Sequence, residues 1–153
     1  MRLIALLGCV AIVAGCTAKE NPPAADTTAM APAPAPAPAM SLASIAGMWN
    51  VTVKPEGKDT VVATYVLNTT DSTAWTFAFP GAKPVPMKIT GMSGDTVMTE
   101  TDWFDSAVRK GLKTRTNATA WMQDGKLVGK TVAHYQTTGP DTVRVFMTEG
   151  TKQ

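Results

Sequence analysis

One cysteine near the start of the chain lies in surroundings that specify its chemistry. Cys16 follows the small residues Ala14 and Gly15, and the mostly apolar residues 3–13 precede them. That apolar run is about half of the roughly twenty residues that a bilayer-spanning helix needs, and it has the size of a signal-peptide core. Small side chains let a processing enzyme approach the backbone, and the Cys16 thiol is then available for acylation. The sequence therefore predicts a signal peptide over residues 1–15 and a lipid on Cys16.

The run Val13-Ala14-Gly15-Cys16 resembles the lipobox of bacterial lipoproteins. The resemblance implies a protein of the cell envelope, anchored in the membrane through acyl chains such as palmitate on Cys16, with its folded part tethered rather than embedded. Thr17 stands where an aspartate would favour retention in the inner membrane, so the resemblance implies the outer membrane. The alternative is an ordinary secretory signal with an incidental cysteine.

Residues that could support catalysis or bind a metal are sparse in the rest of the chain. His134 is the single histidine, and Cys9 would leave with the signal peptide, so neither a disulfide nor a set of metal ligands is expected. There is no nucleophile motif, phosphate loop or dinucleotide fingerprint. The formal net charge of +2 gives no reason to expect a nucleic acid as partner. The sequence favours a protein that is not an enzyme and has no metal and no cofactor.

Composition divides the exported chain into two parts. Residues 16–42 are rich in alanine and proline, with a regular Ala-Pro alternation over 31–39. Proline fixes φ and lacks an amide donor, so this segment predicts an extended, disordered linker. Residues 43–153 carry the large apolar side chains and have the length of one domain with a modest core.

Alternating apolar residues and turn signals in residues 43–153 predict an all-β domain. Trp49, Val51 and Val53 share one face of a strand, and Asp124-Gly125 is the strongest hairpin signal. The predicted strands are 48–53, 60–68, 73–79, 85–90, 95–103, 114–122, 126–135 and 142–149. Short connections pair sequence neighbours antiparallel, and closure removes the exposed edges. We therefore expect an eight-stranded antiparallel up-and-down barrel.

The run Gly47-Met48-Trp49 resembles the Gly-x-Trp opening of the calycin group, which includes the lipocalins and avidins. The resemblance implies a lipocalin-like barrel in which Gly47 and Trp49 close one end. In lipocalins an arginine near the last strand packs over this tryptophan, and Arg144 is the candidate for that position.

Large apolar side chains on several predicted strands could line a cavity inside the barrel, which has room for one small ligand. The candidates are Tyr65, Trp75, Phe77, Phe79, Met87, Ile89 and Trp103. Small residues such as Ala63, Ala118 and Ala133 would leave space beside them if they point inward; the alternative is that they only accommodate the tryptophans.

The long connection 104–113 carries Arg109, Lys110 and Lys113, and its Asp105-Ser106 pair could cap one helical turn that Gly111 would end. These cations could bind an anionic head group or an anionic envelope polymer, or could belong to a solvated loop. Three functional hypotheses remain: a lipoprotein that binds a small apolar or amphiphilic ligand without catalysis, a protein-interaction module of an envelope complex, and an envelope protease inhibitor.

Overall fold

A computed structural model describes residues 40–153 of the chain. The predicted signal peptide, Cys16 and most of the predicted linker lie outside these residues. The elements are α1 (Leu42–Ile45), β1 (Gly47–Pro55), β2 (Ala63–Thr69), β3 (Ala74–Ala78), β4 (Val85–Ser93), β5 (Thr96–Glu100), β6 (Phe104–Asp105), β7 (Lys113–Gln123), β8 (Lys126–Tyr135) and β9 (Val143–Lys152). Residues 40–153 contain no helix that is long and apolar enough to cross a membrane.

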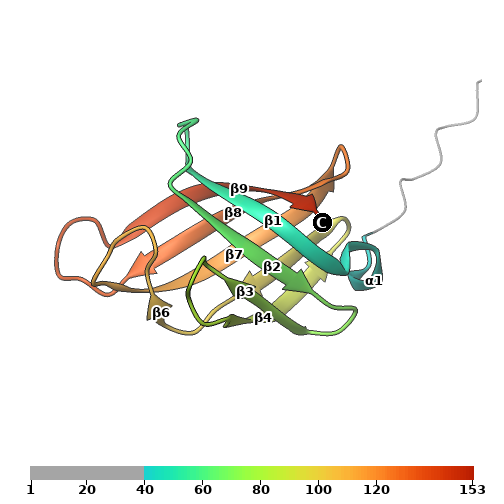
Figure 1. Ribbon diagram of the computed structural model, residues 1–153, viewed down its shortest axis with the longest axis horizontal. Helices are drawn as coiled ribbons and strands as arrows, with labels where there is room; N and C mark the ends of the chain where they lie inside the picture. The colour runs from blue at the N-terminus through green and yellow to red at the C-terminus, as the bar shows by residue number, and fades with distance from the viewer. Residues whose placement is uncertain (1–39) are drawn as a thin grey trace, which may run out of the picture. The chain divides into compact units, whose positions relative to one another are not determined.

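The strands form one closed antiparallel barrel (Figure 1). Each of β1 to β4 pairs with the next strand, β5 pairs with β7, and the series continues through β8 to β9, which pairs with β1. β5 and β6 pair with successive parts of β7 and together occupy one position in the wall. The predicted eight-stranded up-and-down barrel is confirmed, and the Asp124-Gly125 hairpin has the two positive φ angles, 51° and 76°, that a type I′ turn requires.

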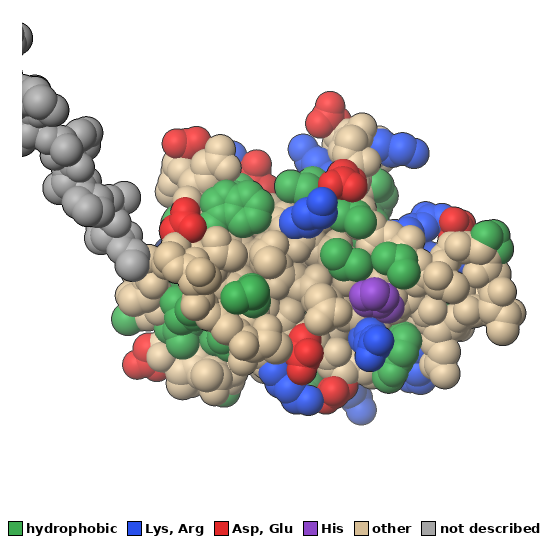
Figure 2. All heavy atoms as spheres, turned by 180° about the vertical axis from the view of Figure 1, so that it is seen from behind, with side chains coloured by type: hydrophobic (Ala, Val, Ile, Leu, Met, Phe, Trp, Pro, Cys, Tyr) green, Lys and Arg blue, Asp and Glu red, His purple; other side chains and the backbone are tan. Residues whose placement is uncertain are grey.

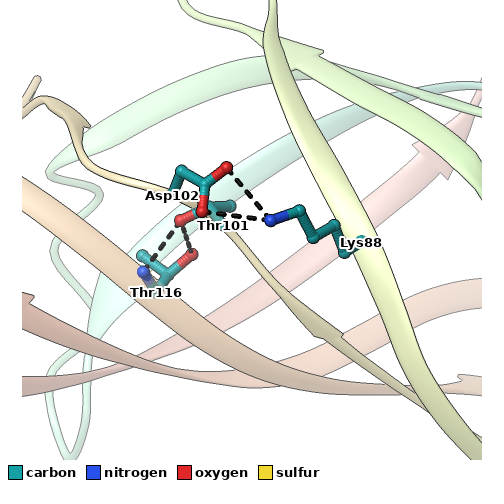
Figure 3. Close-up of polar contacts among 4 residues, drawn as sticks. All are labelled: Lys88, Thr101, Asp102 and Thr116. Atoms are coloured by element: carbon teal, nitrogen blue, oxygen red, sulfur yellow. Dashed lines mark hydrogen bonds and ion pairs between the residues drawn. The ribbon is translucent and has the colours of Figure 1, made fainter.

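The break between β5 and β6 is held to the neighbouring strand by two threonines (Figure 3). The Thr101 and Thr116 hydroxyls lie 3.1 Å apart, the Thr116 amide donates to Thr101 Oγ1 at 2.9 Å, and the Thr101 amide donates to the Thr116 carbonyl at 3.0 Å. Lys88 Nζ of β4 spans the gap to both carboxylate oxygens of Asp102 at 3.1 Å. These contacts hold residues 101–103 to the neighbouring strands at the point, between β5 and β6, where the regular strand pairing is interrupted.

One end of the barrel is closed by α1, an element the sequence analysis did not predict. Ser41 caps the helix, and its hydroxyl and that of Ser44 exchange bonds with each other's backbone amides. The Trp49 indole donates to the Ile45 carbonyl at 3.0 Å, and the buried Thr69 hydroxyl lies 2.5 Å from the same oxygen. The core at this end contains Ile45, Trp49, Val51, Leu67, Trp75, Phe77, Val97 and Leu127.

The cation over Trp49 is Lys152, not Arg144. Lys152 Nζ, at the end of β9, lies 5.5 Å from the centre of the Trp49 ring, whereas Arg144 pairs with Asp141 at 2.9 Å at the other end of that strand. Gly47, two residues before the tryptophan, leaves room for this lysine. Gly47 has φ +141°, and a Cβ there would lie 2.8 Å from Lys152 Cε. Gly47 and Trp49 therefore both belong to the closed end.

Candidate functional site

An apolar cavity of about 80 Å³ lies at the end of the barrel opposite α1. The end of β1, the start of β2 and the paired portions of β7, β8 and β9 form part of its wall. None of its lining side chains is charged. They are Val53, Ala63, Tyr65, Phe77, Phe79, Met87, Phe104, Ser106, Ala107, Val108, Thr114, Thr116, Ala118, Thr131, Ala133, Tyr135, Phe146 and Thr148.

Small side chains on β2, β7 and β8 make this space. Ala118 and Ala133 alternate with outward-facing residues, and both line the cavity, as does Ala63. This arrangement determines the orientation of β7 and β8, which alternation in the sequence left open. The alanines leave unfilled volume because the aromatic residues opposite them pack against one another.

Four aromatic rings form one side of the cavity. Phe77 lies 5.2 Å from Tyr65, 5.6 Å from Phe79 and 5.3 Å from Phe104, measured between ring centroids. The steep angles between most of these rings are typical of favourable edge-to-face contacts. Phe104 was not among the predicted cavity residues, because the sequence placed it in a loop.

The predicted cavity residues have three different locations. Tyr65, Phe77, Phe79 and Met87 line the cavity. Trp75 is fully buried in the core at the closed end, and Ile89 packs partly buried against that core. The expectation for Trp103 was wrong: its side chain is 46 % exposed, and its ring lies 5.4 Å from the Arg115 guanidinium on the outer wall. The break at residues 101–103 turns this side chain away from the interior.

Residues 106–112 fold over the mouth beside the cavity as a lid. The Ser106 amide donates to the Leu112 carbonyl at 2.9 Å, and the Arg109 amide donates to the Ser106 hydroxyl at 3.0 Å. Ser106 thus caps a turn, but no helix follows. Val108 and Leu112 pack against the core cluster of Val53, Ala133, Tyr135 and Phe146 at this end.

The three predicted anion-binding residues do not converge on the cavity. The Arg109 guanidinium lies 4.8 Å above the Tyr135 ring and donates to the Asp141 carbonyl at 2.5 Å, so it fastens the lid to the β8–β9 loop. Lys113 pairs with Asp105 at 3.2 Å, and Lys110 is exposed. Arg109 and Lys113 therefore already contact groups of the protein, and neither lines the cavity.

The two tyrosines are the titratable groups of the cavity lining. Burial raises the pKa of Tyr65 far above its usual value. Burial also raises the pKa of Tyr135, while a hydrogen bond from Ser106 and the nearby charges of Arg144 and Arg109 act in the opposite direction. Both hydroxyls therefore stay protonated at neutral pH. Within residues 40–153, no side chain or backbone group bonds the Tyr65 hydroxyl.

No acidic or histidine side chain is among the residues that line this cavity. Among residues 40–153 there is no group of three His, Cys, Asp or Glu side chains that could hold a metal ion. His134 is partly buried on β8 between two inward-facing residues, Ala133 and Tyr135, so it faces outward, opposite Arg115 and Val143 in the ladder.

The fold and the cavity define a closed eight-stranded antiparallel β-barrel, consistent with a lipocalin-like fold, with one end sealed and a small apolar cavity at the other. Comparison of the chain with protein-family models, with curated proteins and with solved structures found no match.

Proposed function

We propose that this protein binds a small apolar or amphiphilic molecule in the barrel without changing it chemically. The observation that carries the proposal is the cavity itself, a space of about 80 Å³ lined by uncharged side chains beneath a fastened lid. Ligand pockets are typically about 300–1,000 Å³. The cavity therefore accommodates a very small ligand or one end of a larger one.

The absence of catalysis in this proposal rests on the chemistry of the lining. Its polar side chains are serine, threonine and tyrosine, none of them next to a histidine or carboxylate that also lines the space. A general base or activated nucleophile normally needs such a partner. The proposal accordingly includes no cofactor and no metal.

We further propose that the barrel is held at the cell envelope, at the outer membrane, by a lipid on Cys16. The chain has a positive charge at Arg2, then the apolar residues 3–13, the small pair Ala14 and Gly15, and Cys16, and this order supports the anchor. Residues 16–42 would then connect the lipid to the barrel, and a carrier on such a tether could exchange its ligand with the nearby membrane.

Native mass spectrometry of the full chain, purified gently from the envelope of its own host, tests both parts of the proposal. We expect a mass increase from acylation at Cys16 and a second, stoichiometric mass that organic extraction removes. A barrel that stays empty, and takes up nothing from a lipid extract, would rule out the carrier function. A Cys16→Ser chain that still partitions with membranes would rule out the anchor.

A protein-interaction module is the second candidate, because apolar side chains are exposed on the outer wall. Val143 is 49 % exposed and Met147 is 36 % exposed on β9, and Val132 faces Val145 across the β8–β9 ladder. Figure 2 shows apolar side chains beside the histidine on one face, with basic and acidic groups around them. Replacing Val143 and Met147 with serine should abolish capture of an envelope partner if this surface is the functional one, and should leave ligand uptake unchanged.

A further inference from the structure

The barrel wall is open on one side of the cavity, between β2 and β3. Only three residue pairs join these strands, from Asn68↔Thr76 to Val66↔Ala78. β2 continues toward the mouth as far as Ala63, but there its ladder partner is β1 alone. Residues 63–65 therefore have no strand neighbour on the β3 side.

A groove of about 450 Å³ lies on the outer wall at this gap. Alternation along the strands places Thr64, Val66 and Ala78 on the outer face, whereas Val51, Tyr65 and Phe79 belong to the inner one. The groove is lined by both sets together with Asn50, Thr52 and Pro80. It thus reaches from the outer surface to residues of the interior.

Tyr65 and Phe79 separate this groove from the cavity. Both residues line both spaces, and their rings meet edge to face with centroids 5.7 Å apart. The partition therefore includes these two side chains, each of which contacts both spaces. It carries the Tyr65 hydroxyl, which makes no hydrogen bond within residues 40–153. No fully buried polar side-chain atom in this part of the chain lacks a partner, so this hydroxyl is not completely buried.

We propose that the groove and the cavity form one binding site for a neutral molecule, with a short apolar end in the cavity, an oxygen on the Tyr65 hydroxyl, and an apolar remainder in the groove. This inference rests on the proposed function and specifies its ligand class as a neutral alcohol or ester. An engineered cavity of about 150 Å³ holds benzene, so about 80 Å³ holds a few carbon atoms.

The lack of charge in both linings supports a neutral ligand. Neither space is lined by a lysine, arginine, aspartate or glutamate. An ionised group buried without a partner loses its favourable hydration and gains nothing in return. A carboxylate or phosphate placed at Tyr65 would find hydroxyl groups but no cation to replace its water, whereas an alcohol or ester oxygen needs only one hydrogen bond.

The experiment uses NMR titration of the full chain carrying Cys16→Ser, so that no acyl chain competes for the site. The probes are xenon, isoamyl alcohol, the isovalerate anion with the same branched skeleton, and isoamyl butyrate, which adds a tail. Amide signals of Ala133 report the cavity, and those of Ala78 report the groove. We expect isoamyl alcohol to shift the amide signal of Ala133, and isoamyl butyrate to shift the amide signals of both Ala133 and Ala78. We expect isovalerate to bind at least about tenfold more weakly than the alcohol.

Two matched substitutions separate the parts of the site. Tyr65→Phe removes one oxygen and should weaken binding of isoamyl alcohol about fivefold, which is the expected effect of losing one hydrogen bond. Xenon makes no hydrogen bond, so its uptake should show no comparable loss. Ala78→Trp fills the groove. It should weaken binding of the ester about tenfold more than it weakens binding of the alcohol. Thr76→Trp, on the same outer face of β3 but outside the groove lining, is the control and should affect neither probe.

The outcomes distinguish this inference from the proposed function. If xenon and isoamyl alcohol both fail to reach the cavity, the proposed function fails. If they bind but isovalerate binds as tightly as the alcohol, the neutral ligand class is wrong. If the ester leaves Ala78 unshifted, or if Ala78→Trp weakens the ester and the alcohol equally, the groove is not part of the site.

Discussion

The buried hydroxyl of Thr69 joins three parts of the closed end, and replacing Thr69 with valine removes it with little change in shape. The hydroxyl lies 2.5 Å from the Ile45 carbonyl and 3.0 Å from the Gly47 carbonyl, and it accepts from the Trp49 indole at 3.3 Å. Thr69 is 2 % exposed, so water cannot take its place.

The expected loss of stability depends on which polar groups still have a hydrogen-bond partner after the substitution. In Thr69→Val the Ile45 carbonyl still accepts from the Trp49 indole at 3.0 Å, whereas the Gly47 carbonyl loses this contact. One net hydrogen bond is worth about 0.5–1.5 kcal/mol, and a buried group left unbonded costs about 1–3 kcal/mol. We therefore expect the free energy of unfolding to fall by about 1.5 kcal/mol.

Urea unfolding followed by tryptophan fluorescence measures this change. With a slope of about 1.5 kcal/mol per molar, the midpoint should fall by about 1 M. The control is Thr99→Val on β5, where a threonine that is 5 % exposed makes no side-chain hydrogen bond within residues 40–153. Thr99→Val should change stability by less than about 0.5 kcal/mol. Equal midpoints for the two variants would refute the reasoning.

Three further results are expected. Gly47→Ala should destabilise the barrel by about 1–3 kcal/mol, through its positive φ and the contact with Lys152, and adding Lys152→Ala should restore only part of that loss in urea unfolding. Arg109→Ala should speed hydrogen exchange of the lid amides, whereas Lys110→Ala should not; equal rates would exclude Arg109 as the fastener. Since burial raises both tyrosine pKa values in the folded state, their stabilising contribution is complete below about pH 10 and declines above it, by up to about 1.4 kcal/mol per pH unit for each tyrosine. Tyrosinate absorbance of the native protein should therefore appear above pH 10, and ordinary titration of the native protein near pH 10 would contradict this.

The part of the cavity that alternation could predict is the part formed by uninterrupted strands. Tyr65, Phe77 and Met87 were expected inside and line the cavity, because each lies in a stretch of strand where the period-two pattern holds. The irregularity of β4 comes after Met87, between Ile89 and Gly91. The fifth predicted strand, 95–103, was wrong at its end. A shift of one residue moves every later side chain to the opposite face. Val97, Thr99 and Thr101 are buried, but after the break the inward residues are Phe104 and Ser106.

The sequence by itself determined the eight-stranded wall and its antiparallel order, because these depend on local alternation, turn residues and the need to remove sheet edges. The place of Gly47 and Trp49 at the closed end was implied only by the resemblance to the calycin group. Only the tertiary structure decided that Lys152 covers Trp49, that Arg109 fastens a lid, and that β2 and β3 part beside Tyr65. Each of these depends on contacts between residues far apart in the chain. The size of the cavity is also a tertiary property, since it is the volume left after side chains from many strands have packed.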